Sequence, residues 1–127
     1  MLFICYKKCS TCQKAQRYLD GRGFTYSLRD IQSERPLRDE LAAWYAASGL
    51  PLRRFFNTSG LQYRALGLKE KLPSMSEADM LDLLATDGML VKRPLLIAGD
   101  KVLVGFNESE WDAAVPGCFK THDETPE

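Results

Sequence analysis

The sequence contains a single histidine, His122, which lies near the C-terminus. A Cys–His or Ser–His catalytic pair is therefore not expected, because such a pair needs an imidazole beside the nucleophile. A glycine-rich phosphate-binding loop is also missing. We therefore expect neither catalysis by a histidine base nor nucleotide binding through a glycine-rich loop.

An excess of either charge is absent as well, since 17 basic and 17 acidic residues cancel. We therefore expect no direct nucleic-acid or membrane partner. No apolar run is long enough to span a membrane. The short apolar segment 2–6 is followed, not preceded, by lysines, the reverse of a secretory signal. These absences predict a cytoplasmic protein in a compartment that keeps thiols reduced.

The sequence does contain alternating strand and helix patterns, enough for one domain. Its 127 residues predict a single domain, which we place at 1–118, with a polar tail at 119–127. An apolar strand at 2–6, a helix that begins at Ser10 and an alternating strand at 24–28 would form a βαβ unit. The two strands of such a unit are parallel.

The rest of the chain predicts helices and then a hairpin. Residues 36–87 have mostly helical spacing, and Ser76 followed by Asp79 resembles a capping box. Strands at 94–98 and 101–104 would be joined through Gly99 and Asp100, a hairpin signal, and a helix at 108–115 would close the chain. This order predicts an α/β protein of thioredoxin-like fold with a helical insertion at about 36–87.

The chemistry is expected at the pair in Cys9-Ser10-Thr11-Cys12, between the first strand and the first helix. A helix N-terminus stabilises an anion, so Cys9 is the expected nucleophile. Cys12 lies one turn further on, within reach of a disulfide. A disulfide that closes so small a loop contributes only about 2 kcal/mol to stability, which favours a reversible redox pair over a structural crosslink.

Metal binding is the main alternative for these cysteines. Half of a zinc site has the same spacing, but zinc needs four ligands, and the remaining candidates are Cys5, Cys118 and His122. The spacing of Cys5, Cys9 and Cys12 also matches the cluster ligands of radical-SAM enzymes, which need a much larger barrel. We expect no metal, with Cys5 a small core residue and Cys118 incidental.

Arg93 and Pro94 open the third predicted strand. In thioredoxin-like folds a cis-proline at this place faces the active-site cysteines, so we expect a cis Arg93–Pro94 bond. Arg93 would then add positive charge near the thiolate or bind an oxyanion through its fork of donors. An exposed surface arginine beside a proline that merely begins a strand is the alternative.

These motifs together resemble the arsenate-reductase-like (ArsC/Spx) family of thioredoxin-fold proteins. The resemblance spans about residues 2–115, and the matching segments are 9–12, 52–60, 63–68, 92–94 and 104–108. It implies a thioredoxin core with a helical insertion, in agreement with the element order.

The resemblance also implies roles for single residues. In glutaredoxin-dependent arsenate reductases one cysteine attacks arsenate and three arginines hold the oxyanion. Cys9 matches that cysteine and Arg93 one arginine, whereas the other two arginines fall near Asn57 and Gly105. Cys12 stands where those reductases carry another residue, which favours an internal dithiol over arsenate reduction. The candidates to replace the missing arginines are Arg53, Arg54 and Arg64.

The expected function is a thiol-dependent reductase of ArsC type. Cys9 and Cys12 would be catalytic, and Ser10, Thr11, Arg93 and Pro94 would shape the substrate site. No cofactor would be bound, and glutathione, glutaredoxin or thioredoxin would supply electrons. One alternative is an Spx-type redox-sensing transcriptional regulator that binds the C-terminal domain of the RNA polymerase α-subunit. A binding scaffold with an idle cysteine pair is another.

Overall fold

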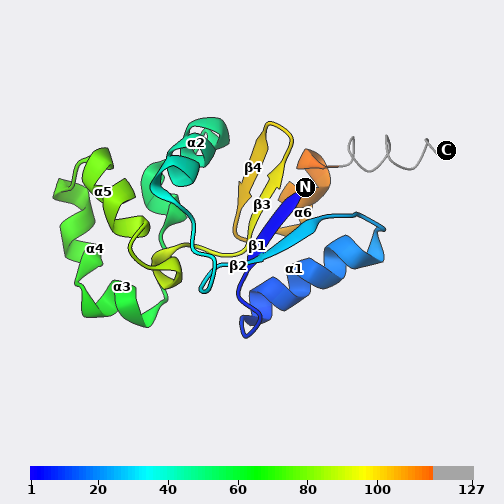
Figure 1. Ribbon diagram of the computed structural model, residues 1–127, viewed down its shortest axis with the longest axis horizontal. Helices are drawn as coiled ribbons and strands as arrows, with labels where there is room; N and C mark the ends of the chain where they lie inside the picture. Colours follow the sequence, from blue (N-terminus) through cyan, green and yellow to red (C-terminus); the bar gives the residue numbers. More distant parts are fainter. Residues whose placement is uncertain (116–127) are drawn as a thin grey trace.

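The computed structural model describes residues 1–115, which are built around a four-stranded mixed sheet (Figure 1). The predicted tail at 119–127, with His122, and also Cys118 lie outside the described residues. The strands are β1 (Leu2–Cys5), β2 (Ser27–Asp30), β3 (Leu95–Ala98) and β4 (Lys101–Val104), in the order β2-β1-β3-β4. β1 is parallel to β2 and antiparallel to β3, and β3 and β4 form the expected hairpin.

One face of the sheet is covered by α1 (Ser10–Gly21) and α6 (Glu108–Ala114). Side chains alternate along a strand, so Phe3 and Cys5 of β1 and Leu96 of β3 all contribute to the core on this side. Trp111 fills its centre, with its ring in an edge-to-face arrangement 6.4 Å from that of Phe3, and the indole N–H donates to the Gly105 carbonyl.

The other face is covered by the helical insertion, which lies on the opposite side of the sheet in Figure 1. Ile4, Leu95 and Val102 point into the core on this side. The insertion consists of α2 (Arg38–Ser48), η1 (Leu52–Phe55), α3 (Leu61–Ala65), α4 (Leu68–Lys71), η2 (Leu72–Ser74), α5 (Glu77–Leu84) and η3 (Gly88–Leu90). The expected thioredoxin-like core with a helical insertion is therefore confirmed.

The second strand lies further along the chain than its predicted position at 24–28. Phe24 is buried, and its N–H donates to the Leu19 carbonyl at 3.1 Å, so this part of the segment caps the preceding helix. Pairing with β1 begins only at Ser27, whose N–H donates to the carbonyl of Met1. The predicted alternation was real, but it reflected burial of Phe24 against α1 and not sheet pairing.

A short antiparallel bridge fastens the insertion to the chain entering β3. Phe56 pairs with Val91, and the Lys92 N–H donates to the Phe55 carbonyl at 2.8 Å. Nearby, a Cβ added to Gly88 would lie 1.8 Å from the Ile31 carbonyl oxygen, so only glycine permits this approach of two backbones. Residues 92 and 93 are thereby held between the insertion and the sheet.

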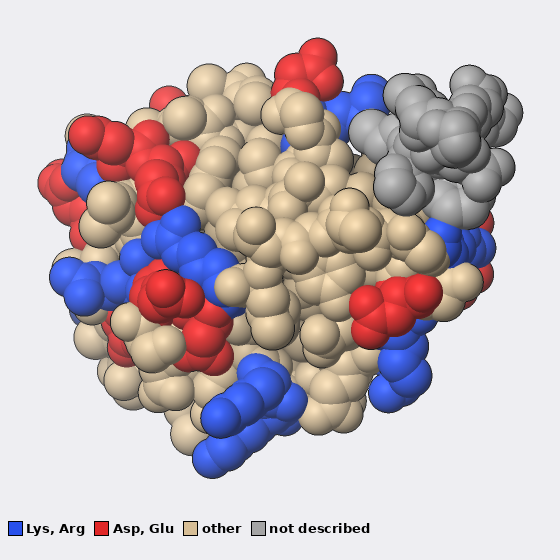
Figure 2. Space-filling model, turned by 45° about the vertical axis from the view of Figure 1, so that its right-hand side comes forward, with Lys and Arg blue, Asp and Glu red and all other residues tan. Residues whose placement is uncertain are grey.

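On the face shown in Figure 2, acidic and basic side chains both lie around the margin of a broad area that carries no charged side chains. Among residues 1–115, no helix has both the length and the apolar character needed to cross a bilayer.

Candidate active site

Cys9 occupies the N-cap position of α1, with extended backbone angles. Its N–H donates to the Tyr6 carbonyl at 2.9 Å, and its own carbonyl accepts from Gln13 at 3.0 Å, which begins the helix. The N–H groups of the first helical turn have no acceptor within the helix, so they favour negative charge near the half-buried Cys9 thiol.

Cys12 lies one turn further into α1 and is only 1% exposed. The Tyr6 N–H donates to its Sγ at 3.3 Å. A hydrogen bond with the Cys5 thiol, together with burial, raises the pKa of Cys12 well above its ordinary value. Cys12 therefore stays a protonated thiol at neutral pH, and Cys9 is the sulfur that a substrate can reach.

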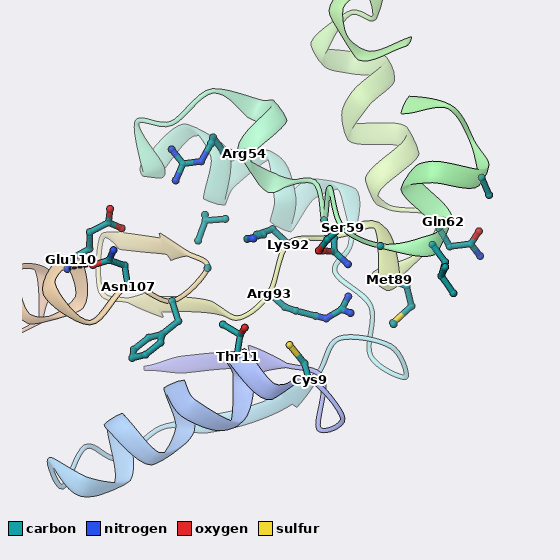
Figure 3. A pocket seen from close by; sticks show the side chains of 17 residues that line it. Cys9, Thr11, Arg54, Ser59, Gln62, Met89, Lys92, Arg93, Asn107 and Glu110 are labelled. Atoms are coloured by element: carbon teal, nitrogen blue, oxygen red, sulfur yellow. Dashed lines mark hydrogen bonds between the residues drawn. The ribbon is translucent and has the colours of Figure 1, made fainter. Parts of the chain in front are cut away.

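Cys9 opens into a groove of about 1030 Å³ between the thioredoxin core and the insertion (Figure 3). Four segments far apart in sequence form its walls: the start of α1, residues 54–65 of the insertion, residues 89–93, and residues 104–110 after β4. Because the insertion supplies one whole wall, the site exists only when both halves of the fold are packed together.

Arg93 reaches into this groove from the segment before β3. The Arg93–Pro94 bond is cis, as expected. The guanidinium lies 5.3 Å from the centre of the Tyr6 ring, and its buried Nη1 has no hydrogen-bond partner within the described residues. Figure 3 shows the side chain extending across the groove near Cys9. A buried donor without a partner is unfavourable unless a ligand satisfies it, which makes Arg93 a candidate for binding a ligand.

Two further cations, Arg54 and Lys92, line the same groove, whereas Glu110 is the one carboxylate among its described lining residues. Within residues 1–115 neither cation takes part in an ion pair. The groove therefore carries an excess of positive charge that suits an anionic substrate. No role was expected for Lys92 from the sequence, although its place directly before Arg93 was a usable signal.

The positions matched to the family's missing arginines do converge on the groove, because both Asn57 and Gly105 line it. Of the three candidate replacements, only Arg54 is a lining residue. Arg53 borders a smaller neighbouring hollow, and Arg64 donates to the Ser59 carbonyl at 3.3 Å. Arg54 therefore supplies one of the two missing positive charges to the groove, but from a different position in the sequence.

The remaining predicted site residues divide between the groove and its support. Thr11 lines the groove, whereas Ser10 is exposed outside it. Pro94 is buried behind the wall, where its carbonyl accepts from the Gly105 N–H at 2.8 Å. Over the part of the chain that the structure describes, no three His, Cys, Asp or Glu side chains are arranged to hold a metal ion.

Known proteins are similar to this chain over most of its length. The family model "ArsC family" matches residues 5–114. The "Uncharacterized protein YusI" of Bacillus subtilis is 50% identical over 112 residues, covering 88% of this chain and 95% of the relative. More distant relatives include proteins named arsenate reductase and global transcriptional regulator Spx.

Solved structures resemble the whole described fold. A "putative ArsC family related protein" from Bacteroides fragilis superposes with a TM-score of 0.87 at 49% identity, covering 88% of this chain and 94% of that one. A "possible arsenate reductase" from Streptococcus mutans UA159 gives 0.80 at 44% identity, covering 87% and 96%. With a matching family model over most of its length and relatives of this similarity, the chain belongs to the ArsC family.

Proposed function

We propose that this protein is a thiol–disulfide oxidoreductase in which Cys9 attacks the substrate and Cys12 resolves the intermediate. The observation that carries the proposal is the unequal placement of the two thiols. Cys9 is half-buried at a helix N-terminus and opens into a groove, whereas Cys12 is buried directly behind it with a raised pKa. A structural cysteine pair would have no need of a groove.

The reaction proceeds in two exchanges. The Cys9 thiolate attacks one sulfur of a substrate disulfide, forms a mixed disulfide and releases the other sulfur as a thiolate. The Cys12 thiol then attacks Cys9 Sγ, its proton goes to the departing substrate thiolate, and a Cys9–Cys12 disulfide remains. Two electrons from an external thiol, such as glutathione or a glutaredoxin- or thioredoxin-type protein, restore the dithiol.

The cations of the groove support substrate binding and leaving-group departure. Arg54, Lys92 and Arg93 line the groove into which Cys9 opens and would stabilise a substrate that carries carboxylates and the thiolate it releases. Arsenate is a poorer match for this groove, because Asn57 and Gly105 occupy two positions at which arsenate reductases carry the arginines that hold the oxyanion. Such thiol chemistry requires a reducing compartment, and we propose the cytoplasm.

Turnover of a disulfide tests this proposal. The reduced protein is mixed with bis(2-hydroxyethyl) disulfide and glutathione as the electron donor, and the glutathione disulfide that forms is followed through NADPH consumption by glutathione reductase. We expect activity in the wild type and none in Cys9→Ser. An inactive wild type with both thiols intact would contradict the proposal, and added arsenate in place of the disulfide tests the family activity directly.

A redox-sensing regulator is the second candidate, favoured by the relatives named Spx and MgsR, which are 21–24% identical to this chain. In that case the cysteine pair would switch binding to the C-terminal domain of the RNA polymerase α-subunit. Binding of that domain to the reduced and the oxidised protein distinguishes the two functions. Binding that depends on the redox state, with no disulfide turnover, would favour the regulator.

A further inference from the structure

A third thiol, that of Cys5, lies beneath the cysteine pair. Cys5 ends β1 and is 6% exposed, and it belongs to the same buried cluster as Cys12. Cys9 packs against the edge of this cluster. All three cysteines are free thiols. The proposed catalytic cycle uses two of them and leaves Cys5 without a role.

Cys12 is the middle member of this group. The Tyr6 N–H, which follows Cys5 directly in the chain, holds Cys12 Sγ over the end of β1. In this position Cys12 packs with Cys5 in one buried cluster, and Cys9 packs against that cluster. A sulfur in contact with thiols from two different segments has two candidate partners for a disulfide.

We propose that Cys5 is a second resolving thiol, which attacks Cys12 Sγ in the oxidised protein and converts the Cys9–Cys12 disulfide into a Cys5–Cys12 disulfide. This inference rests on the proposed dithiol function. In the step, a bond forms between the sulfurs of Cys5 and Cys12, the Cys9–Cys12 bond breaks, and Cys9 leaves as a thiolate. The proton of Cys5 is released to solvent or to Cys9, and no net oxidation occurs.

Two properties of the structure favour this isomer. The Cys5–Cys12 bond closes a loop of eight residues, compared with four for Cys9–Cys12, and a crosslink that closes a longer loop removes more freedom from the unfolded chain. The bond would also be buried, beyond the reach of external thiols. The protein would store oxidising equivalents in its core while Cys9 becomes free to react again.

The positions of the lysines make the two isomers easy to distinguish. Trypsin cleaves after Lys7, Lys8 and Lys14, so Cys5 lies in peptide 1–7, and Cys9 and Cys12 share peptide 9–14. A Cys9–Cys12 disulfide stays within one peptide, whereas a Cys5–Cys12 disulfide joins two. The experiment uses the full chain with Cys118→Ser, which removes the cysteine outside the group.

This protein is oxidised with one equivalent of glutathione disulfide, incubated with iodoacetamide, acidified, digested and mapped by mass spectrometry. We expect peptide 1–7 joined to 9–14 through Cys12, with the alkyl group on Cys9, and this product should accumulate with time as alkylation traps the freed thiol. In Cys5→Ala, which keeps the catalytic pair, alkylation of Cys9 in the oxidised protein should be at least tenfold slower.

Other results would overturn the inference. A Cys9–Cys12 disulfide that forms in both proteins, with Cys5 alkylated only after denaturation, would rule out Cys5 as a partner and leave the dithiol function standing. Failure of both proteins to form any disulfide would overturn the dithiol function and this inference together.

Discussion

Replacing Arg93 by glutamine should separate stability from activity. Its Nη1 is buried without a hydrogen-bond partner among the described residues, and its one described ring contact is with Tyr6, 5.3 Å from the guanidinium. Loss of that cation–π contact costs about 0.5–1 kcal/mol, while removal of the unsatisfied donor recovers about 1–3 kcal/mol. We therefore expect Arg93→Gln to be no less stable than the wild type, with a gain of up to about 2.5 kcal/mol in the free energy of unfolding.

Activity should respond much more strongly, because the free donor is available to substrate. A hydrogen bond to a charged group is worth about 1.5–3 kcal/mol, which corresponds to a loss of about 10- to 150-fold in kcat/KM. The assay takes kcat/KM from the second-order rate constant for oxidation of the pre-reduced protein, and compares glutathione disulfide, which is anionic, with bis(2-hydroxyethyl) disulfide, which is neutral. The larger loss should fall on the anionic disulfide, and Arg93→Lys should recover part of it by retaining the charge.

A matched control is Arg53→Gln, since Arg53 is a neighbouring arginine that does not line the groove. It should leave kcat/KM unchanged for both disulfides. The reasoning is refuted if Arg93→Gln lowers the free energy of unfolding by more than about 2 kcal/mol and leaves kcat/KM intact, because Arg93 would then be a structural residue.

Three further predictions concern the thiols and the packing around them. Cys12→Ser should trap glutathione on Cys9 as a stable mixed disulfide that mass spectrometry detects. Cys9→Ser should form no such adduct, because Cys12 is buried and protonated. An adduct that forms on Cys12 as fast as on Cys9 would reverse the roles of the two cysteines. Burial and a hydrogen bond to the Asp112 carboxylate raise the pKa of Tyr18 from 10.0 to about 12. Because the folded state then binds the phenol proton more tightly than the unfolded state, the free energy of unfolding should fall between pH 10 and 12. The expected fall is up to about 1.4 kcal/mol per pH unit. Chemical unfolding of Tyr18→Phe should lack this fall, and an unchanged slope would disprove the assignment. Gly88→Ala places a Cβ 1.8 Å from a backbone oxygen and should lower the free energy of unfolding, measured by denaturant titration, by about 2 kcal/mol or more. Gly21→Ala has open space around the new Cβ and should be neutral or slightly stabilising. Equal effects of the two substitutions would contradict the packing argument.

The cysteine pair shows how far local sequence information extends. A buried strand, a turn and a helix start are set within a dozen residues, so the position of Cys9 at the N-cap could be predicted. The same holds for Ser76, whose hydroxyl accepts from the Asp79 N–H, and for the Gly99 turn between β3 and β4. Each of these features depends on contacts between residues close together in the chain.

The second strand shows where this information ends. Its predicted position at 24–28 and its observed position at Ser27–Asp30 differ by about three residues. Alternation shows that a segment has a buried side but not what buries it, and Phe24 is buried by α1. Strand register is decided by the neighbouring strand, in this case by pairing of Leu2 with Ser27.

By itself, the sequence determined the class of fold, the place of the cysteine pair at a helix start and the resemblance to the ArsC family, because each is encoded in short segments. The tertiary structure alone decided which cations line the groove beside Cys9 and which thiol lies beneath Cys12. Arg54 and Lys92 meet at the groove because backbone hydrogen bonds between residues 55–57 and 90–92 fasten the insertion to the chain before β3. Cys5 meets Cys12 because α1 packs across the end of β1, a contact between segments that spacing along the chain does not specify.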